Sequence, residues 1–182
     1  MKNSLVSLKR FVFFLTALFL VNIVIAQSNS KIRKLKADSK VAKAEFIKGD
    51  ALMKSLFSNA YGYVIFPNIG KGGLGIGGAA GSGIVYTKGM AIGSARMKQL
   101  TIGFQAGGQA YREVIFFESK NDMDRFKNSN FELSAQASAV AVTEGASANL
   151  KYKDGVMIFT QTKGGLMYEA SVGGQKFDFK SF

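Results

Sequence analysis

The sequence predicts an α+β fold: an N-terminal helical arm, then a strongly curved, mostly antiparallel, Gly-rich β-sheet that is barrel-like and carries one inserted helix. Three observations lead to this fold class. Residues 31–48 contain no Gly or Pro and are rich in good helix formers. Several glycines alternate with larger residues through residues 70–83. Short runs of β-branched and aromatic residues, separated by turn residues, then continue to the C-terminus.

The first 26 residues have the three parts of a secretory signal peptide. Lys2, Lys9 and Arg10 form a basic start, residues 11–25 are an apolar run, and the small residue Ala26 ends the segment. We therefore expect residues 1–26 to be a signal peptide and the protein to be periplasmic or secreted, peripheral to a membrane. The competing interpretation is a retained membrane anchor, because the apolar run approaches the roughly 20 residues that a spanning helix needs.

Composition narrows the class of partner. Removing 26 of the 182 residues leaves 156, enough for one domain with its own core. The formal net charge is +12, which favours anionic partners such as phospholipid head groups, acidic polymers or nucleic acid. An exported protein rarely meets nucleic acid, so we expect no nucleic-acid partner. The chain has no Cys, so the fold must be stabilised by packing without disulfides.

The helical arm is expected to span residues 27–58. At about 100° per residue, one stripe of the helix at residues 31–48 is mostly apolar and one flank is basic. The stripe consists of Ile32, Leu35, Ser39, Ala42 and Phe46, and the flank of Arg33, Lys36, Lys40 and Lys43. Gly49 interrupts this pattern, and Asp50 is predicted to cap a second short helix at residues 51–58.

The remaining residues, 59–182, are expected to form the Gly-rich β domain, and arm and β domain together one domain. A buried strand begins at Tyr61 and is predicted to end at Pro67-Asn68, and the glycine run and residues 84–86 follow. Residues 120–127, with early acids and later basic residues, are the inserted helix. Further strands are expected at 90–97, 100–109, 113–118, 137–143, 147–152, 156–160, 166–172 and 176–179.

The amino-acid composition gives little support for an enzyme. Without His or Cys, the usual proton shuttle and the usual zinc and thiol sites are absent, so we expect no enzyme, no metal and no cofactor. Asp122 and Asp124 are close together, but acids at a helix start commonly serve as caps; a hydrolase using either carboxylate is the rival interpretation.

The residue patterns argue against two further classes, a nucleotide-binding protein and an outer-membrane barrel. Residues 73–78 spell Gly-x-Gly-x-x-Gly, but no helix opens on the last glycine, so we expect no nucleotide. An outer-membrane barrel would need alternating apolar residues up to Phe182, and Lys180 and Asp178 break that alternation.

Residues 60–85 resemble the SYLF domain, a lipid-binding module of bacterial exported proteins and eukaryotic membrane-trafficking proteins. Three features are shared: Phe66-Pro67, Lys71-Gly72-Gly73 and the glycine alternation up to Gly83. The similarity continues through residues 103–109, 114–117, 131–133, 144–145, 156–160 and 163–166. It implies phospholipid binding with a preference for anionic head groups, to which an N-terminal amphipathic helix contributes. The actin binding of the yeast branch is not expected of an exported protein.

We therefore expect a non-enzymatic phospholipid-binding module at a membrane surface. The predicted lipid-binding residues are Lys31, Arg33, Lys34, Lys36, Lys40, Lys43 and Lys71. Two plainer interpretations stay open: the arm could simply pack its apolar stripe on the sheet, and the glycines near Lys71 could serve the coiling of the sheet instead of an anion site. The alternative function is an exported structural or interaction protein that binds an envelope protein or an acidic glycan.

Overall fold

The computed structural model describes residues 29–103, 109–128, 131–134, 138–148, 150–163 and 170–182. The predicted signal peptide lies outside these ranges. Residues 35–182 form one compact unit, which is the unit described below. Of the helices in the described parts of the chain, none combines the length and the hydropathy that a membrane crossing requires.

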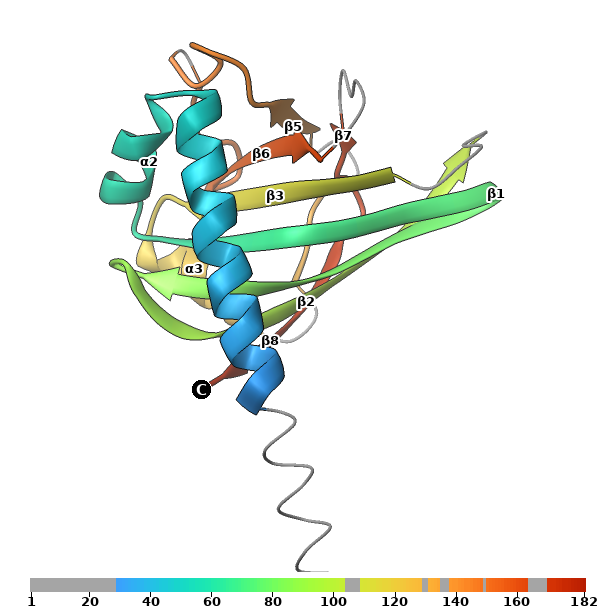
Figure 1. The fold of residues 1–182 in the computed structure, drawn as a ribbon, viewed down its shortest axis with the longest axis horizontal. Helices are drawn as coiled ribbons and strands as arrows, with labels where there is room; N and C mark the ends of the chain where they lie inside the picture. The colour runs from blue at the N-terminus through green and yellow to red at the C-terminus, as the bar shows by residue number, and fades with distance from the viewer. Residues whose placement is uncertain (1–28, 104–108, 129–130, 135–137, 149, 164–169) are drawn as a thin grey trace, which may run out of the picture. The chain divides into compact units, whose positions relative to one another are not determined.

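Three helices and eight strands make up the described residues (Figure 1). The N-terminal helix spans residues 29–49, α2 spans Met53–Asn59 and α3 spans Lys120–Lys127. The strands are β1 (Gly62–Thr87), β2 (Met90–Gly103), β3 (Gln109–Phe117), β4 (Phe131–Glu132), β5 (Ser138–Ala141), β6 (Val156–Thr162), β7 (Ala170–Ser171) and β8 (Lys176–Ser181).

The strands form one sheet in the order β4-β8-β2-β1-β3-β6-β5-β7, and the sheet curls into a half-barrel. Every described pairing between strands is antiparallel except that of β5 with β6. The inserted helix is α3, between β3 and β4. The predicted α+β class, the curved and mostly antiparallel sheet and the inserted helix are all confirmed.

The predicted end of the first strand at Pro67-Asn68 is wrong. β1 continues through these residues, and its pairing with β3 shifts register between Phe66 and Ile69. A proline has no N–H to give to a ladder, and such an irregularity is where a strand tolerates one. The extended backbone therefore passes through Pro67 without a turn.

The glycine run lets β1 fold back on itself. The Lys88 N–H donates to the Tyr61 carbonyl at 3.3 Å, so the two ends of β1 lie side by side. A Cβ on Gly83 would lie 2.6 Å from the Ile65 carbonyl oxygen, and one on Gly81 would lie 2.9 Å from that of Asn68. Only residues without a Cβ permit this approach of two backbones, which supports the architectural interpretation of the run.

Several strand boundaries also differ from the prediction. β2 is one strand where two were expected, at 90–97 and 100–109, and β3 already begins at Gln109. The described residues of the range 147–152 form no strand, although one was expected there. Ser147 instead donates two hydrogen bonds to the Asp50 carboxylate, from its backbone nitrogen at 2.9 Å and from its hydroxyl at 2.7 Å. Of the strand expected at 166–172, residues 170–171 form β7 and 166–169 lie outside the described ranges.

The predicted cap of the second helix is displaced. α2 begins at Met53, and its N-cap residue is Leu52, without a side-chain cap. The Asp50 carboxylate accepts from the Leu52 N–H at 3.0 Å and also holds Ser147, so it ties the start of α2 to the loop after β5.

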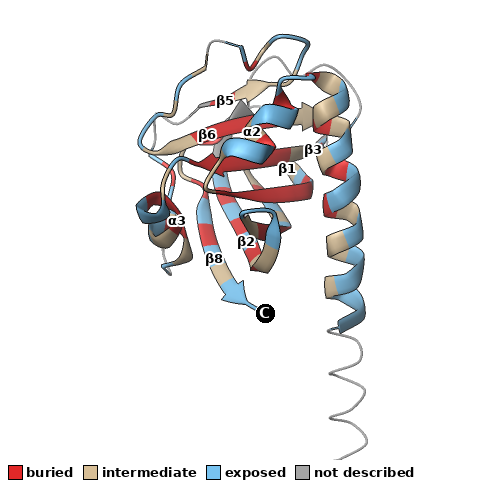
Figure 2. Cartoon of the chain, turned by 90° about the vertical axis from the view of Figure 1, so that its left-hand side faces the viewer, coloured by how far each residue is buried: buried red, intermediate tan, exposed pale blue. Residues whose placement is uncertain are grey.

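Two apolar cores lie on opposite faces of the sheet, and Figure 2 shows the buried residues along its strands. We call the core beneath the N-terminal helix the helix core; it contains Ala42 and Phe46 of that helix with Val114 and Phe116 of β3. We call the core beneath α3 the α3 core; it contains Met123 and Phe126 of α3, packed with Ile115 and Phe117 of β3. Successive residues of β3 thus serve different cores, as the period of two in a strand requires. Ser39, Ala42 and Phe46 of the predicted helix stripe are all buried.

Candidate functional site

Two of the predicted lipid-binding lysines pack against aromatic rings. The Lys36 ammonium lies 4.0 Å from the centre of the Phe182 ring. The Lys43 ammonium lies 4.7 Å from the centre of the Phe57 ring and donates to the Tyr63 hydroxyl at 3.1 Å. Burial lowers the pKa of Lys43. Both cations already have a partner within the fold, which makes them weaker candidates for a lipid head group.

The outward face of the N-terminal helix carries a different set of side chains. Within residues 35–49, the exposed positions opposite Ala42 and Phe46 combine small apolar residues with two lysines. They are Ala37, Lys40, Val41, Ala44 and Lys48, and Val41 is 62% exposed. We call these five residues the outward face. Apolar side chains flanked by lysines are typical of a helix that lies on an anionic membrane.

Sequence reasoning missed Val41 and Lys48. Their spacing from Ala37 and Ala44 places all of them on one helix face, so the same periodicity that located Phe46 could have found them.

Of the other predicted residues, Lys71 is not part of this face. Lys31, Arg33 and Lys34 lie in the first turns of the helix with exposed side chains. Lys71 is partly exposed on β1, where it pairs with Gln109 in the ladder to β3. Eight residues of strand separate Lys71 from Tyr63, the contact of Lys43, which is a span of roughly 26 Å. Lys71 and the helix therefore do not form one cluster.

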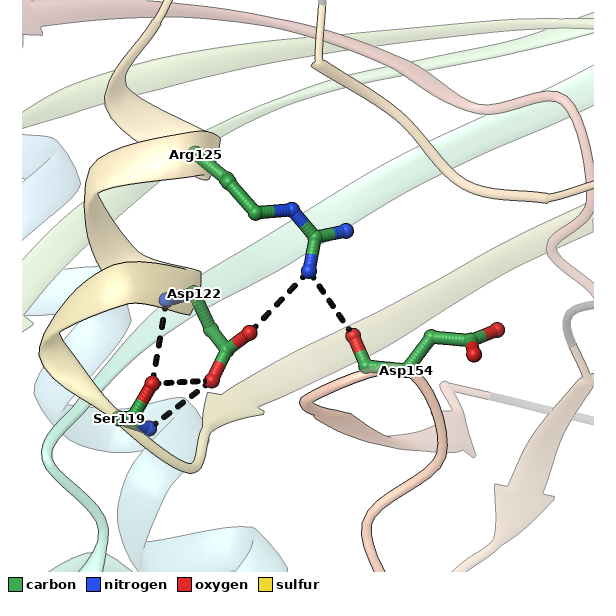
Figure 3. A network of polar contacts seen from close by, with 4 residues as sticks. All are labelled: Ser119, Asp122, Arg125 and Asp154. Carbon is green, nitrogen blue, oxygen red and sulfur yellow. Dashed lines mark hydrogen bonds and ion pairs between the residues drawn. The ribbon is translucent and has the colours of Figure 1, made fainter.

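Asp122 and Asp124 have structural partners, and Figure 3 shows those of Asp122. Ser119 and Asp122 form a capping box at the start of α3, and the Asp122 carboxylate also accepts from Arg125 at 3.1 Å. Asp124 pairs with Lys120 and with Lys127. Of the carboxylates singled out for a hydrolase, Asp122 thus caps the start of α3, and Asp124 pairs with lysines of the same helix. The described residues also contain no group of three or more acidic side chains that could hold a metal ion.

A polar group is buried in the α3 core. Glu113 lies on the same face of β3 as Tyr111 and Ile115, is fully buried, and accepts from the Gln175 amide at 3.0 Å. Burial raises the pKa of Glu113 to about 7. The second carboxylate oxygen of Glu113, the Thr160 hydroxyl and the side-chain oxygen of Gln175 have no hydrogen-bond partner among the described residues. Nothing in the sequence pattern marked this site, since Glu113 stands in an ordinary strand.

A cavity of about 530 Å³ opens beside α3 and β6. Seven apolar side chains line it together with five exposed charged ones, which we call its rim. The apolar side chains are Phe131, Leu133, Val140, Leu150, Val156, Met157 and Ile158, and the charged ones are Arg125, Glu132, Lys151, Lys153 and Asp154.

Comparison with known proteins identifies the family of this chain. Residues 98–181 match the family model Ysc84, described as "Las17-binding protein actin regulator". The chain belongs to this SYLF family. Beta cell expansion factor A of Aeromonas veronii, also a SYLF-type protein, is 32% identical over 126 residues, which are 68% of this chain and 48% of that protein. The chain thus spans about half the length of this curated relative.

The matched part of the SYLF domain contains β3, α3, β6 and β8, and with them every residue that lines the cavity. The N-terminal helix and β1 lie before it in the sequence. SYLF proteins are associated with lipids and with actin patches, and the family is not an enzyme family.

Proposed function

We propose that this SYLF protein is a non-enzymatic phospholipid-binding protein that contacts anionic head groups at a membrane surface. The observation that carries the proposal is the outward face, where Lys40 and Lys48 flank the exposed Val41 on a helix whose opposite side is anchored in the helix core. Lys31, Arg33 and Lys34 add exposed cations in the first turns. Each Lys or Arg near an anionic surface contributes about 1 kcal/mol, so a few exposed cations suffice for recruitment.

We further propose that the protein is exported and acts peripherally to a membrane, in the periplasm or outside the cell. The basic start, apolar run and small exit of residues 1–26 support export. N-terminal sequencing of protein recovered from the native host tests cleavage: the proposal expects Gln27 as the first residue, and an intact Met1 on membrane-bound protein would mean a retained anchor.

The first experiment is co-sedimentation of the purified protein with phosphatidylcholine vesicles and with phosphatidylcholine–phosphatidylglycerol vesicles, at low and at physiological salt. We expect the protein to pellet with the anionic vesicles only. A protein that stays in the supernatant throughout would overturn the proposal and favour the alternative, an envelope protein or an acidic glycan as partner.

Charge reversal on the outward face locates the contact. The variant Lys40→Glu/Lys48→Glu removes two attractive charges, worth about 2 kcal/mol, so we expect at least about a 30-fold loss of partitioning into anionic vesicles. The matched control is Lys98→Glu/Lys180→Glu, which makes the same charge change at two exposed lysines of β2 and β8. An equal loss in both variants would mean that net charge, and not this face, decides binding.

Deleting the helix would be a poorer test. Ala42 and Phe46 cover Val114 and Phe116 in the helix core, so removing residues 27–48 would expose that core as well as removing lysines. Substitution of exposed side chains leaves the packing intact.

A further inference from the structure

We propose that the cavity beside α3 and β6 binds a single acyl chain that carries an anionic head group. This site is separate from the outward face of the N-terminal helix and would take individual lipid molecules from solution without membrane contact. Its place in the sheet, its lining and its rim each support this ligand class.

The cavity lies where the two ends of the strand order face each other. β4 stands at one end of the sheet, whereas β5 and β6 stand near the other. Nevertheless, Leu133, next to β4, lines the same cavity as Val140 of β5 and Ile158 of β6. The curl of the sheet therefore brings its two edges together without joining them, and the cavity is the gap that remains in the half-barrel.

The lining suits an acyl chain. Leu133 and Ile158 belong to the α3 core, whereas Met157 belongs to the helix core, so the cavity extends between the two apolar cores. Phe131 and Leu150 are only partly buried there and offer apolar surface to a ligand. A volume of about 530 Å³ lies within the usual range of small-molecule sites, roughly 300–1,000 Å³. Covering such apolar surface with hydrocarbon is favourable.

The rim favours an anionic head group. Three exposed cations stand there, Arg125, Lys151 and Lys153. Of the two carboxylates at the rim, Glu132 is paired with Lys176 at 3.4 Å, on the side of β8. Arg125 is paired in the same way with Asp122, so two lysines stand against the one carboxylate of Asp154, and a carboxylate or phosphate head group would complement those lysines.

Arg125 is held in place at the rim. Its guanidinium donates to the Asp122 carboxylate at 3.1 Å and to the Asp154 carbonyl at 3.3 Å (Figure 3). It also lies 5.8 Å from the centre of the Phe131 ring, whose side chain lines the cavity. One cation of the rim is thus positioned before any ligand arrives, which lowers the ordering cost of binding.

The test is titration of the purified protein with a fluorescent fatty acid, 11-(dansylamino)undecanoic acid, below its critical micelle concentration. We expect a saturable rise and blue shift of dansyl emission. Myristate and lysophosphatidylglycerol, added as competitors, distinguish a free fatty acid from a phospholipid headgroup as the preferred source of the anion. Monomyristoylglycerol, which has the chain without the charge, should displace the probe at least about tenfold less well than myristate.

Variants assign the site. Lys151→Glu/Lys153→Glu should weaken probe binding by about tenfold or more, and Ser134→Trp, which adds bulk at an exposed position of the lining, should reduce it as well. The control Lys98→Glu/Lys180→Glu and the outward-face variant Lys40→Glu/Lys48→Glu should both bind the probe like the wild type. Circular dichroism confirms that each variant is folded.

Either of two results would overturn the proposal: no saturable emission change with the wild type, or equal binding by wild type, Lys151→Glu/Lys153→Glu and Ser134→Trp. Failure of vesicle binding alone leaves this site untouched, because the probe titration contains no membrane. Conversely, a protein that pellets with anionic vesicles but does not bind the probe supports only the membrane-surface proposal.

Discussion

At the scale of single residues, Glu113 is a carboxyl group buried inside the sheet. The Glu113 side chain is fully buried on the side of β3 that faces the α3 core. Among the described residues, its carboxylate accepts one hydrogen bond, from the Gln175 amide. Burial raises its pKa from the ordinary 4.5 to about 7, because the apolar surroundings disfavour the carboxylate. Near neutral pH this side chain is therefore partly a neutral acid inside the sheet.

Replacing Glu113 by Gln should make folding less sensitive to pH. The folded state keeps the proton up to about pH 7, whereas the unfolded chain releases it near 4.5, so the contribution of Glu113 to stability is fully present below pH 4.5 and is lost as the pH rises through 7. We expect the free energy of unfolding of Glu113→Gln, relative to wild type, to rise by about 3 kcal/mol from about pH 4 to about pH 8.

Urea titrations across that pH range measure the effect. The control is Glu118→Gln, the same substitution at an exposed carboxylate directly after the same strand. Parallel curves for wild type and Glu113→Gln would show that the carboxyl is not desolvated as described.

At the scale of elements, α3 is attached to the sheet through the turn before β6. Asp154 and Gly155 have positive φ angles of 52° and 77°, and Lys153 and Val156 exchange backbone hydrogen bonds across them. The Glu118 N–H donates to the Gly155 carbonyl at 3.0 Å, and Arg125 of α3 donates to that of Asp154. A tight turn, a strand end and a helix cap therefore depend on one another.

Gly155→Ala should destabilise the protein more than the same change at another turn glycine. A Cβ at Gly155 would lie 2.0 Å from an Asp122 carboxylate oxygen, so the capping box of α3 would have to move. Gly89 has the same φ of 77° but nothing within 4 Å of its Cβ position, so Gly89→Ala suffers the backbone strain alone, about 1–2 kcal/mol.

We expect the thermal midpoint of Gly155→Ala to lie clearly below that of Gly89→Ala, with an additional loss of about 1–3 kcal/mol. Differential scanning calorimetry of the two variants and the wild type gives the comparison. Equal midpoints for both variants would mean that the Asp122 cap can shift at no cost.

At the scale of the whole molecule, the two cores share their strands. Val114 and Phe116 face the helix core, whereas Ile115 and Phe117, between and beside them, face the α3 core. Neither core can lose its strands without opening the other. The N-terminal helix from Leu35 onward is part of this unit, because Phe46 is fully buried in the helix core.

Phe46→Ala should therefore destabilise both cores together. We expect a loss of about 3–5 kcal/mol and one cooperative unfolding transition, at the same lowered urea midpoint by far-ultraviolet circular dichroism and by tyrosine fluorescence. The protein contains six Tyr and no Trp, so the tyrosine signal can be followed without interference. Val41→Ala on the exposed side of the helix is the control, with a change within about 0.5 kcal/mol. Separate midpoints for the two probes would show that the helix unfolds on its own.

The sequence by itself determined the features that depend on neighbouring residues. The periodicity of Ser39, Ala42 and Phe46 located the buried side of the N-terminal helix, and the acids and bases of residues 120–127 located α3. The glycine alternation predicted a sheet that coils sharply. The predicted membership of the SYLF family is confirmed by the family match at residues 98–181.

Only the tertiary structure decided which groups meet across long stretches of chain. The fold-back of β1 brings Gly83 to Ile65, Glu113 is buried because Gln175 and the α3 core cover it, and the cavity exists because the curled sheet brings β4 toward β6. Lys36, a surface residue by pattern, meets Phe182 for the same reason. These contacts join residues far apart in sequence, and no local periodicity or propensity encodes them.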